Sequence, residues 1–127
     1  DKLILPALAA GKWVVSDRFT DASYAYQGGG RGLAPEKIMA LESWVQAGFQ
    51  PDLTVGFDLP TDIACERLSQ TGKTRDRFEQ ETWEFFERVR ESYLQRAGAE
   101  PDRIKVIDSR QSISEIQKLL EQRIITI

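Results

Sequence analysis

Histidine is absent from this sequence of 127 residues, and cysteine occurs only once, at Cys65. Without imidazole, the chain cannot build a histidine-based catalytic triad, a histidine metal ligand or an imidazole proton shuttle. A single thiol excludes an intrachain disulfide framework and is compatible with a reducing compartment. Apolar runs are short, none approaching the length that crosses a bilayer, and no signal peptide is visible. We therefore expect a cytoplasmic protein that does not bind membranes.

An excess of positive charge is also missing. Lysine and arginine number 17 against 20 aspartates and glutamates, so the formal net charge is -3. A general nucleic-acid binder usually carries a basic excess, and this balance argues against that class. Any anion site must therefore come from local clusters of basic residues. The length and a hydrophobic fraction of 41% predict a single domain over residues 1–127.

The most informative stretch runs from Trp13 to Leu33 and reads WVVSDRFTDASYAYQGGGRGL. Its first four residues, 13–16, predict a short buried strand. Asp17 and Arg18 follow at the end of this strand, where parallel α/β sheets bind their ligands. An adjacent carboxylate and guanidinium suit a magnesium-bound phosphate better than an apolar ligand. The alternative is a simple surface ion pair at a strand end.

Helices and strands alternate along the rest of the chain. We expect helices over residues 1–10, 20–27, 35–47, 62–70, 79–97 and 112–123, and strands over residues 13–16, 52–59 and 103–108. The glycine run 28–32 is expected to break the helix before it and to act as a flexible connection, with Arg31 at the surface. This order predicts a parallel α/β sheet. Three strands are few for such a sheet, so we expect a piece of a larger domain.

Three features of the 13–33 stretch occur together at fixed spacing: DRF, a serine five residues after the arginine, and AYQGGGRGL. With this long, gap-free combination of unlike residues, the chain resembles bacterial thymidylate kinase. The resemblance extends over nearly the whole chain. It implies an α/β, P-loop nucleotide-kinase-like three-layer sandwich with a parallel sheet, incomplete in this chain. It also implies the C-terminal part of that fold, without the N-terminal P-loop region.

The resemblance gives roles to five residues of this stretch. Arg18 would lie against the phosphates near the transferred group, since its planar fork grips two oxygens. Asp17 would bind at the dTMP side and hold magnesium through a water. Ser23 and Gln27, four residues apart on one helix face, would read the thymine edge. Tyr26 would pack near the sugar. In isolation, ordinary solvated polar residues on a helix would be the commoner interpretation of such a pattern.

A second segment, TGKTRDRFEQE from residue 71, resembles the family's lid over ATP, at about residues 71–78. Its GKT ends like a Walker A motif, but position 67 is arginine where that motif needs glycine, and a helix precedes it. We therefore exclude a phosphate loop here. Lys73, Arg75 and Arg77 would act as catalytic residues by stabilising charge during phosphoryl transfer. A solvated charged loop is the alternative for any one of them.

By the same resemblance, Arg67 would stack on adenine, with Ser109 and Arg110 forming the other wall of an ATP site. An ordinary exposed arginine is the alternative for Arg67. The bulky aromatic side chains of later helices are expected in the core or on a dimer face; they are Trp44, Trp83, Phe85 and Phe86. The single thiol of Cys65 is expected to be buried and inert.

Taken together, the resemblance implies ATP-dependent phosphorylation of dTMP to dTDP, with Mg²⁺ as cofactor, in a homodimer. Because the sequence contains no phosphate loop, we expect the chain alone to have little or no activity. Two alternatives stay open. One is a different P-loop nucleotide or deoxynucleoside kinase. The other is a noncatalytic fragment that serves as a dimerisation or binding module.

Overall fold

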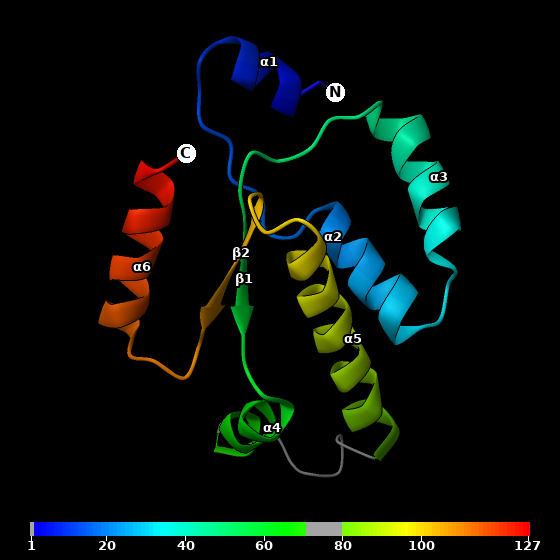
Figure 1. Cartoon of the computed structure of the whole chain (residues 1–127), viewed down its shortest axis with the longest axis vertical. Helices are drawn as coiled ribbons and strands as arrows, with labels where there is room; N and C mark the ends of the chain where they lie inside the picture. The colour runs from blue at the N-terminus through cyan, green and yellow to red at the C-terminus, as the bar shows by residue number, and fades with distance from the viewer. Residues whose placement is uncertain (1, 71–79) are drawn as a thin grey trace.

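A parallel pair of strands lies at the centre of the molecule (Figure 1). The computed structural model describes residues 2–70 and 80–127. Strand β1 (Thr54–Asp58) pairs in parallel with β2 (Ile104–Asp108), in a register that runs from Thr54↔Ile104 to Asp58↔Asp108. Between them the chain forms α4 (Thr61–Gln70) and α5 (Gln80–Ala99). The expected parallel α/β arrangement is confirmed by this pair.

The remaining helices match most of the expected ranges. They are α1 (Ile4–Ala9), α2 (Thr20–Ser23), the π-helix η1 (Tyr24–Gly30), α3 (Pro35–Gln46) and α6 (Ile113–Ile125). Local signals explain several ends. Pro35 occupies the first turn of α3, and Ala47 ends that helix in the left-handed region at φ 49°. Ser112 and Glu115 form the expected capping box of α6.

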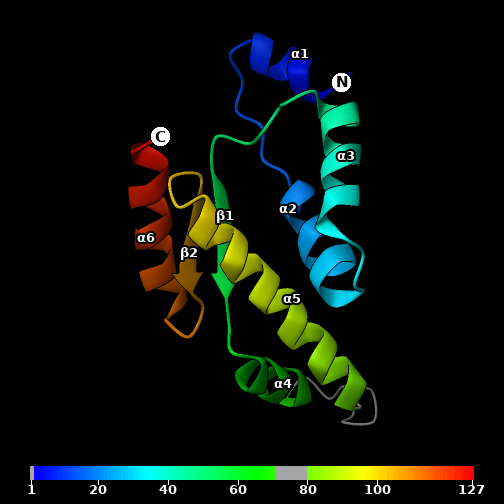
Figure 2. The ribbon, with the colours of Figure 1, turned by 45° about the vertical axis from the view of Figure 1, so that its right-hand side comes forward.

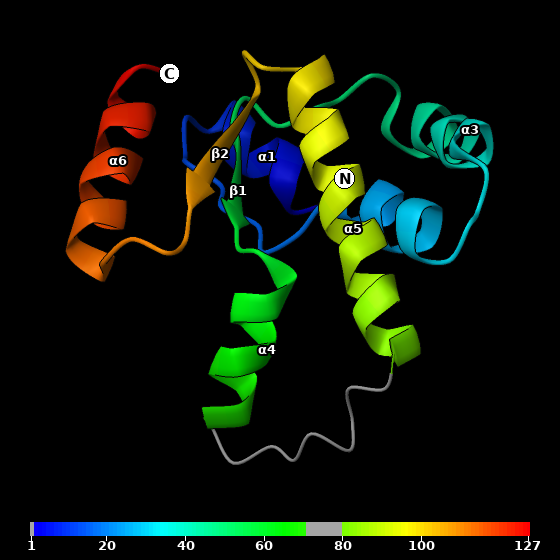
Figure 3. The same ribbon diagram turned by 60° about the horizontal axis from the view of Figure 1, so that its bottom comes forward.

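The helices lie on both sides of the strand pair. Helix α6 lies beside β2 on one side, whereas α5 crosses on the other, with α2, η1 and α3 beyond it (Figures 2 and 3). The buried apolar residues lie mainly between α5, η1 and the strands; they are Tyr24, Ala25, Ile38, Val89, Ala97, Ile104 and Ile107. This order of helix, sheet and helix is the layering expected of an α/β fold.

The predicted strand over residues 13–16 is wrong. Residues 13–16 are among the described residues and form no strand. Trp13 and Val15 are 73% and 93% exposed. A strand depends on hydrogen bonds to a neighbouring strand, and β1 pairs with β2. The β-branched and aromatic residues there satisfy a local preference for extended backbone, but local preference does not supply a pairing partner.

The prediction that the glycine run breaks the helix is also wrong. The helix that begins at Thr20 continues as η1 through Gly30 and packs on α5. A Cβ atom built on Gly29 would lie 2.6 Å from Cβ of Ser92, and one on Gly30 would lie 2.5 Å from Cε2 of Phe85. These two glycines therefore allow close helix contact. Left-handed backbone follows only at Gly32, where φ is 76°.

Helix α3 carries its predicted apolar stripe, but most of the stripe faces solvent. Ile38 is 5% exposed and packs inward. Leu41, Trp44 and Val45 are 56%, 83% and 65% exposed. The periodicity predicted the helix correctly, yet an apolar stripe does not reveal which surface covers it.

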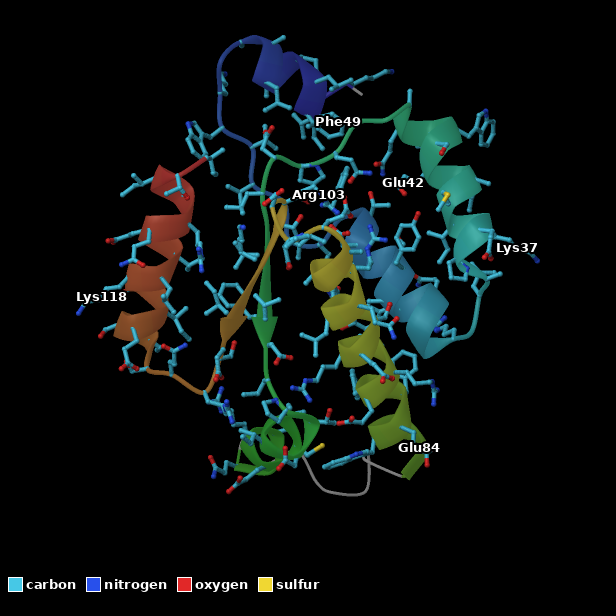
Figure 4. All side chains as sticks on the ribbon, in the orientation of Figure 1. Lys37, Glu42, Phe49, Glu84, Arg103 and Lys118 are labelled. Carbon is cyan, nitrogen blue, oxygen red and sulfur yellow. The ribbon has the colours of Figure 1, made fainter. Side chains whose placement is uncertain are left out.

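A buried cluster of charges joins α2 to the end of α5 and the start of β2. Asp21, 4% exposed, accepts from Arg96 Nε at 2.8 Å and from Arg103 Nη1 and Nη2 at 2.9 and 3.0 Å. Thr54, at the start of β1, donates to the same carboxylate at 3.3 Å. We call Asp21, Arg96 and Arg103 the Asp21 charge cluster. Figure 4 labels Arg103 beside the amino-terminal ends of the two strands.

The Asp21 charge cluster keeps its carboxylate ionised. Burial alone would raise the pKa of Asp21, but hydrogen bonds from Arg103 and Arg96, together with their positive charge, outweigh it and hold the pKa below the ordinary 3.8. The same hydrogen bonds raise the pKa of the Arg103 guanidinium. A buried carboxylate with two guanidinium partners stabilises the fold as long as all three groups remain paired.

We expect Asp21→Asn to lower the free energy of unfolding by about 3 kcal/mol near neutral pH, because it leaves Arg96 and Arg103 with only the more exposed carboxylate of Glu100 as counter-charge. The folded-state pKa of Asp21 is depressed, so its stabilisation is present above the unfolded pKa and is lost as pH falls through the folded value. The gap between the original protein and Asp21→Asn should therefore shrink below about pH 4. Urea unfolding of both proteins at several acidic pH values measures this difference in the free energy of unfolding. A difference that does not change with pH would contradict the ion pair.

The glycine contact gives a second prediction. Gly29→Ala should destabilise the protein by about 1–3 kcal/mol, because the added methyl group meets the backbone oxygen of Arg88 at 2.9 Å as well as Ser92. Gly28→Ala is the matched control, since its nearest neighbour is the movable end of the Ile38 side chain at 3.2 Å. Thermal unfolding of the two variants should separate them. Equal melting temperatures would show that η1 does not pack on α5 this closely.

Candidate functional site

An open cleft of about 420 Å³ lies along the segment from Arg18, two residues before α2, to Arg31, the residue after η1. Its lining residues are Arg18, Phe19, Ala22, Ser23, Tyr26, Gln27 and Arg31. The structure therefore brings four of the residues predicted for nucleotide binding to one surface: Arg18, Ser23, Tyr26 and Gln27. The fifth, Asp17, is exposed beside Arg18 and is not part of the lining.

Arg18 owes its direction to an unusual backbone conformation. Its φ is 66°, in the left-handed region that a non-glycine residue rarely adopts. The Ser16 hydroxyl donates to the Arg18 carbonyl at 2.8 Å and supports this turn. The guanidinium carbon lies 4.9 Å from the centre of the Tyr26 ring, within the range of a cation–π contact. Strained backbone of this kind is common at binding sites, and here it occurs at a cation that lines the cleft.

Tyr26 forms an aromatic wall between the cleft and α5. Its ring centre lies 6.2 Å from that of Phe85 and 6.3 Å from that of Tyr93, the latter edge to face. Phe86 packs on Phe85 at 5.5 Å and is 39% exposed. Burial raises the pKa of Tyr93, so its hydroxyl stays protonated. Helix α5 thus holds Tyr26 in place from behind while Arg18 covers its other side.

Ser23 and Gln27 lie on successive turns of the continuous helix formed by α2 and η1, and both line the cleft. A hydroxyl and a carboxamide offer donors and acceptors together, as the edge of a pyrimidine requires. Arg31 follows four residues after Gln27 and lines the same cleft. Arg31 is exposed, as the sequence predicted, but its place in the cleft lining was not predicted. The spacing 23, 27, 31 was the available signal, once the helix is continued through the glycines.

Phe19 and Ala22 are the other lining residues that the sequence analysis did not identify. Phe19 packs edge to face on Phe49, with ring centres 6.2 Å apart, which anchors the start of α2. Ala22 leaves space in the cleft because its side chain is a single methyl group. Neither residue type carries a chemical signal of binding in a sequence, and only their position reveals them.

A second group of polar residues lies at the carboxyl ends of β1 and β2. Arg67 on α4 donates to the Ser109 carbonyl at 3.1 Å, so two residues predicted for an ATP site are adjacent. Arg110 turns back to Asp108, with Nη2 2.7 Å from Oδ2, and these hydrogen bonds lower the pKa of Asp108 to about 2. Ligands of parallel α/β sheets bind at this edge.

Asp58, at the end of β1, is paired with α5 at the same edge. Its carboxylate accepts from Arg90 Nε at 2.8 Å and from Arg90 Nη2 at 3.1 Å. This fork raises the pKa of the Arg90 guanidinium. Arg90 therefore fixes the end of β1 relative to α5.

Several predicted residues have no place in these clusters. Lys73, Arg75 and Arg77 lie outside the described residues. In the part of the chain that the structure covers, no three Cys, Asp or Glu side chains gather closely enough to hold a metal ion. Cys65 is half-buried rather than buried, and burial raises the pKa of its thiol, which keeps it protonated. Of the described helices, none is long and apolar enough to cross a membrane.

Comparisons with known proteins show which family the chain resembles. Residues 1–120 match the family model of thymidylate kinase. The thymidylate kinase of Thiobacillus denitrificans is 64% identical over 116 residues, which cover 91% of this chain and 56% of the relative. That of Cupriavidus necator is 56% identical over 126 residues, which cover 99% of this chain and 62% of the relative. The chain spans about 60% of the length of the curated relatives it matches.

A solved structure agrees with these relatives. The crystal structure of thymidylate kinase from Ehrlichia chaffeensis matches with a TM-score of 0.71 at 28% sequence identity. The match covers 99% of this chain and 57% of that chain. The two-stranded sheet and its helices therefore correspond to part of a larger known fold.

Proposed function

The chain belongs to the thymidylate kinase family, and from this membership we propose that it serves in the ATP-dependent phosphorylation of dTMP to dTDP. The observation that carries the proposal is that Arg18, Ser23, Tyr26 and Gln27 all line the same cleft. Four residues chosen for one substrate meet on one surface there. A cytoplasmic location belongs to the same proposal, and the single cysteine is compatible with it.

The proposed chemistry divides the cleft by charge. The Arg18 guanidinium contacts the phosphate of dTMP and stabilises the negative charge that spreads over the phosphoryl oxygens during transfer. Ser23 and Gln27 hydrogen-bond the pyrimidine, and Tyr26 packs against the sugar. Arg31, at the far end of the lining, adds a second positive charge to the cleft. These contacts orient the acceptor oxygen toward the donor phosphate.

We place the phosphate donor, ATP, at the carboxyl ends of β1 and β2. Arg67 and Ser109 lie together there and would contact the adenine of ATP, with Arg110 beside them. Lys73, Arg75 and Arg77 would add positive charge around the transferred group. Because the sequence contains no G-x-x-x-x-G-K-[ST] motif, we propose that the 127-residue chain by itself has little or no activity.

In the proposed site, Mg²⁺ makes one contact with this chain, through a water, at Asp17. Asp17 is exposed at the bend beside Arg18, so its carboxylate can accept a hydrogen bond from a metal-bound water. Among the described residues no three carboxylates gather to bind the ion directly, so the proposed contact is through one water. When bound, Mg²⁺ neutralises charge on the ATP phosphates.

A homodimer through α3 is the proposed assembly. Leu41, Trp44 and Val45 form a continuous apolar face that is largely exposed. Burial of such a face between two copies would contribute about 25 cal/mol for each Å² of apolar surface. Helix faces of this kind are commonly interaction surfaces.

The catalytic proposal is tested in a chimera that completes this chain with the remaining part of the Cupriavidus necator relative. Arg18→Ala should lower turnover of dTMP by about 10²–10³-fold, because it removes the charge-stabilising fork. Arg123→Ala, on α6, is the matched control and should leave turnover unchanged. Unaltered turnover in Arg18→Ala would remove Arg18 from the site.

Substrate choice and activity of the short chain are measured in the same assay. A chimera that prefers dUMP, dCMP or thymidine to dTMP would indicate a different nucleotide or nucleoside kinase. Robust turnover by the isolated 127-residue chain would refute its proposed inactivity.

The dimer proposal is tested with Trp44→Glu. Trp44 is 83% exposed, so the change should leave the fold intact while placing a charge in the proposed interface. Analytical ultracentrifugation of the chimera should show a shift from dimer to monomer. Glu36→Gln, on the same helix, is the control. A chimera that is monomeric before substitution would contradict the proposal.

A further inference from the structure

Ala22, Ser23, Tyr26 and Gln27 of the cleft lie on the continuous helix formed by α2 and η1. A row of polar side chains on α5 holds the opposite side of this helix. Arg88, Ser92 and Arg96 are spaced four residues apart, so they share one face of α5. We call them the α5 polar stripe. Arg96 binds the Asp21 carboxylate, Ser92 donates to the Tyr24 carbonyl at 3.2 Å, and Arg88 donates to the Gly30 carbonyl at 3.0 Å.

These contacts hold the continuous helix formed by α2 and η1 along its whole length. Arg96 touches it twice, since its guanidinium also stacks on the Tyr24 ring, 3.8 Å from the ring centre. The Tyr24 hydroxyl donates to Glu42 on α3 at 2.6 Å, which supports the ring from the far side. Of these contacts, the ion pair made by Asp21 is the most directional, because a guanidinium fork fixes the orientation of a carboxylate.

The position of Asp21 determines where the next residues point. Successive residues of an α-helix are rotated by about 100°, so Ser23 lies about 200° around α2 from Asp21. When Arg96 and Arg103 draw Asp21 inward, Ser23 must face outward, toward the cleft. The cluster thus sets the rotation of the helix that lines the cleft.

We propose that Asp21 is a positioning residue for the substrate: its buried ion pair with Arg96 and Arg103 fixes the helix rotation that presents Ser23 and Gln27 to the pyrimidine of dTMP. The inference rests on the proposed function, because that function names the substrate. Asp21 itself does not touch the cleft, so its effect is on binding of one substrate and not on the chemical step. An apolar residue in place of Asp21 would fill the same space without fixing the rotation of the helix about its axis.

The test measures kinetic constants in the chimera for Asp21→Asn and for a matched control, Glu100→Gln. Glu100 pairs with the same two arginines, at 2.6 Å from Arg103 and 3.6 Å from Arg96, and its contacts do not reach α2. In Asp21→Asn the KM for dTMP should rise about tenfold or more, while the KM for ATP and kcat stay within about threefold. In Glu100→Gln all three should stay within about twofold.

Two results would overturn the positioning role. One is a folded Asp21→Asn enzyme with an unchanged KM for dTMP; the other is an equal rise in the KM for both substrates, which a general structural defect would produce. If Asp21→Asn does not fold, Arg96→Gln carries the same readouts, because Asp21 keeps Arg103 as a partner. A chimera without substitutions that fails to phosphorylate dTMP would instead overturn the proposed function.

Discussion

The structure depends on one buried carboxylate. Asp21 is bound by two arginines that lie 75 and 82 residues further along the chain, and this contact closes the molecule around its strand pair. A carboxylate at this depth is tolerated only when opposite charge and hydrogen bonds compensate its lost hydration. Both are present, so the start of α2, the end of α5 and the start of β2 are joined at a single point.

Close helix packing extends this anchor along the rest of the cleft helix. Gly29 and Gly30 allow η1 to approach α5 more closely than any side chain would permit. The same approach brings Tyr26, which lines the cleft, against Phe85 and Tyr93 of α5. The glycine run is therefore a packing surface. This close packing also explains why the polar, partly exposed helix formed by α2 and η1 can hold a fixed position.

The apolar surface of the molecule is unevenly covered. Ile104 and Ile107 of β2 are buried, whereas Trp13, Val15 and Trp44 are largely exposed. Large exposed apolar side chains of this kind commonly mark surfaces that other polypeptide covers. The family relationship gives this a context, because the chain spans only about 60% of the length of its curated relatives.

The sequence by itself determined the features that depend on neighbouring residues. Pro35 predicted the start of α3, Ser112 and Glu115 predicted the cap of α6, and the four-residue spacing of Ser23 and Gln27 predicted a shared helix face, because each signal lies within about ten residues of chain. Only the tertiary structure decided the rest.

Residues 13–16 prefer an extended backbone, but a strand needs a partner that local sequence cannot supply. Asp21 reads as an ordinary helix residue until Arg96 and Arg103 are brought to it from the far end of the chain. Local preferences act over a few residues, whereas pairing, burial and ion pairs depend on contacts between distant ones, and these form only when the whole chain has folded.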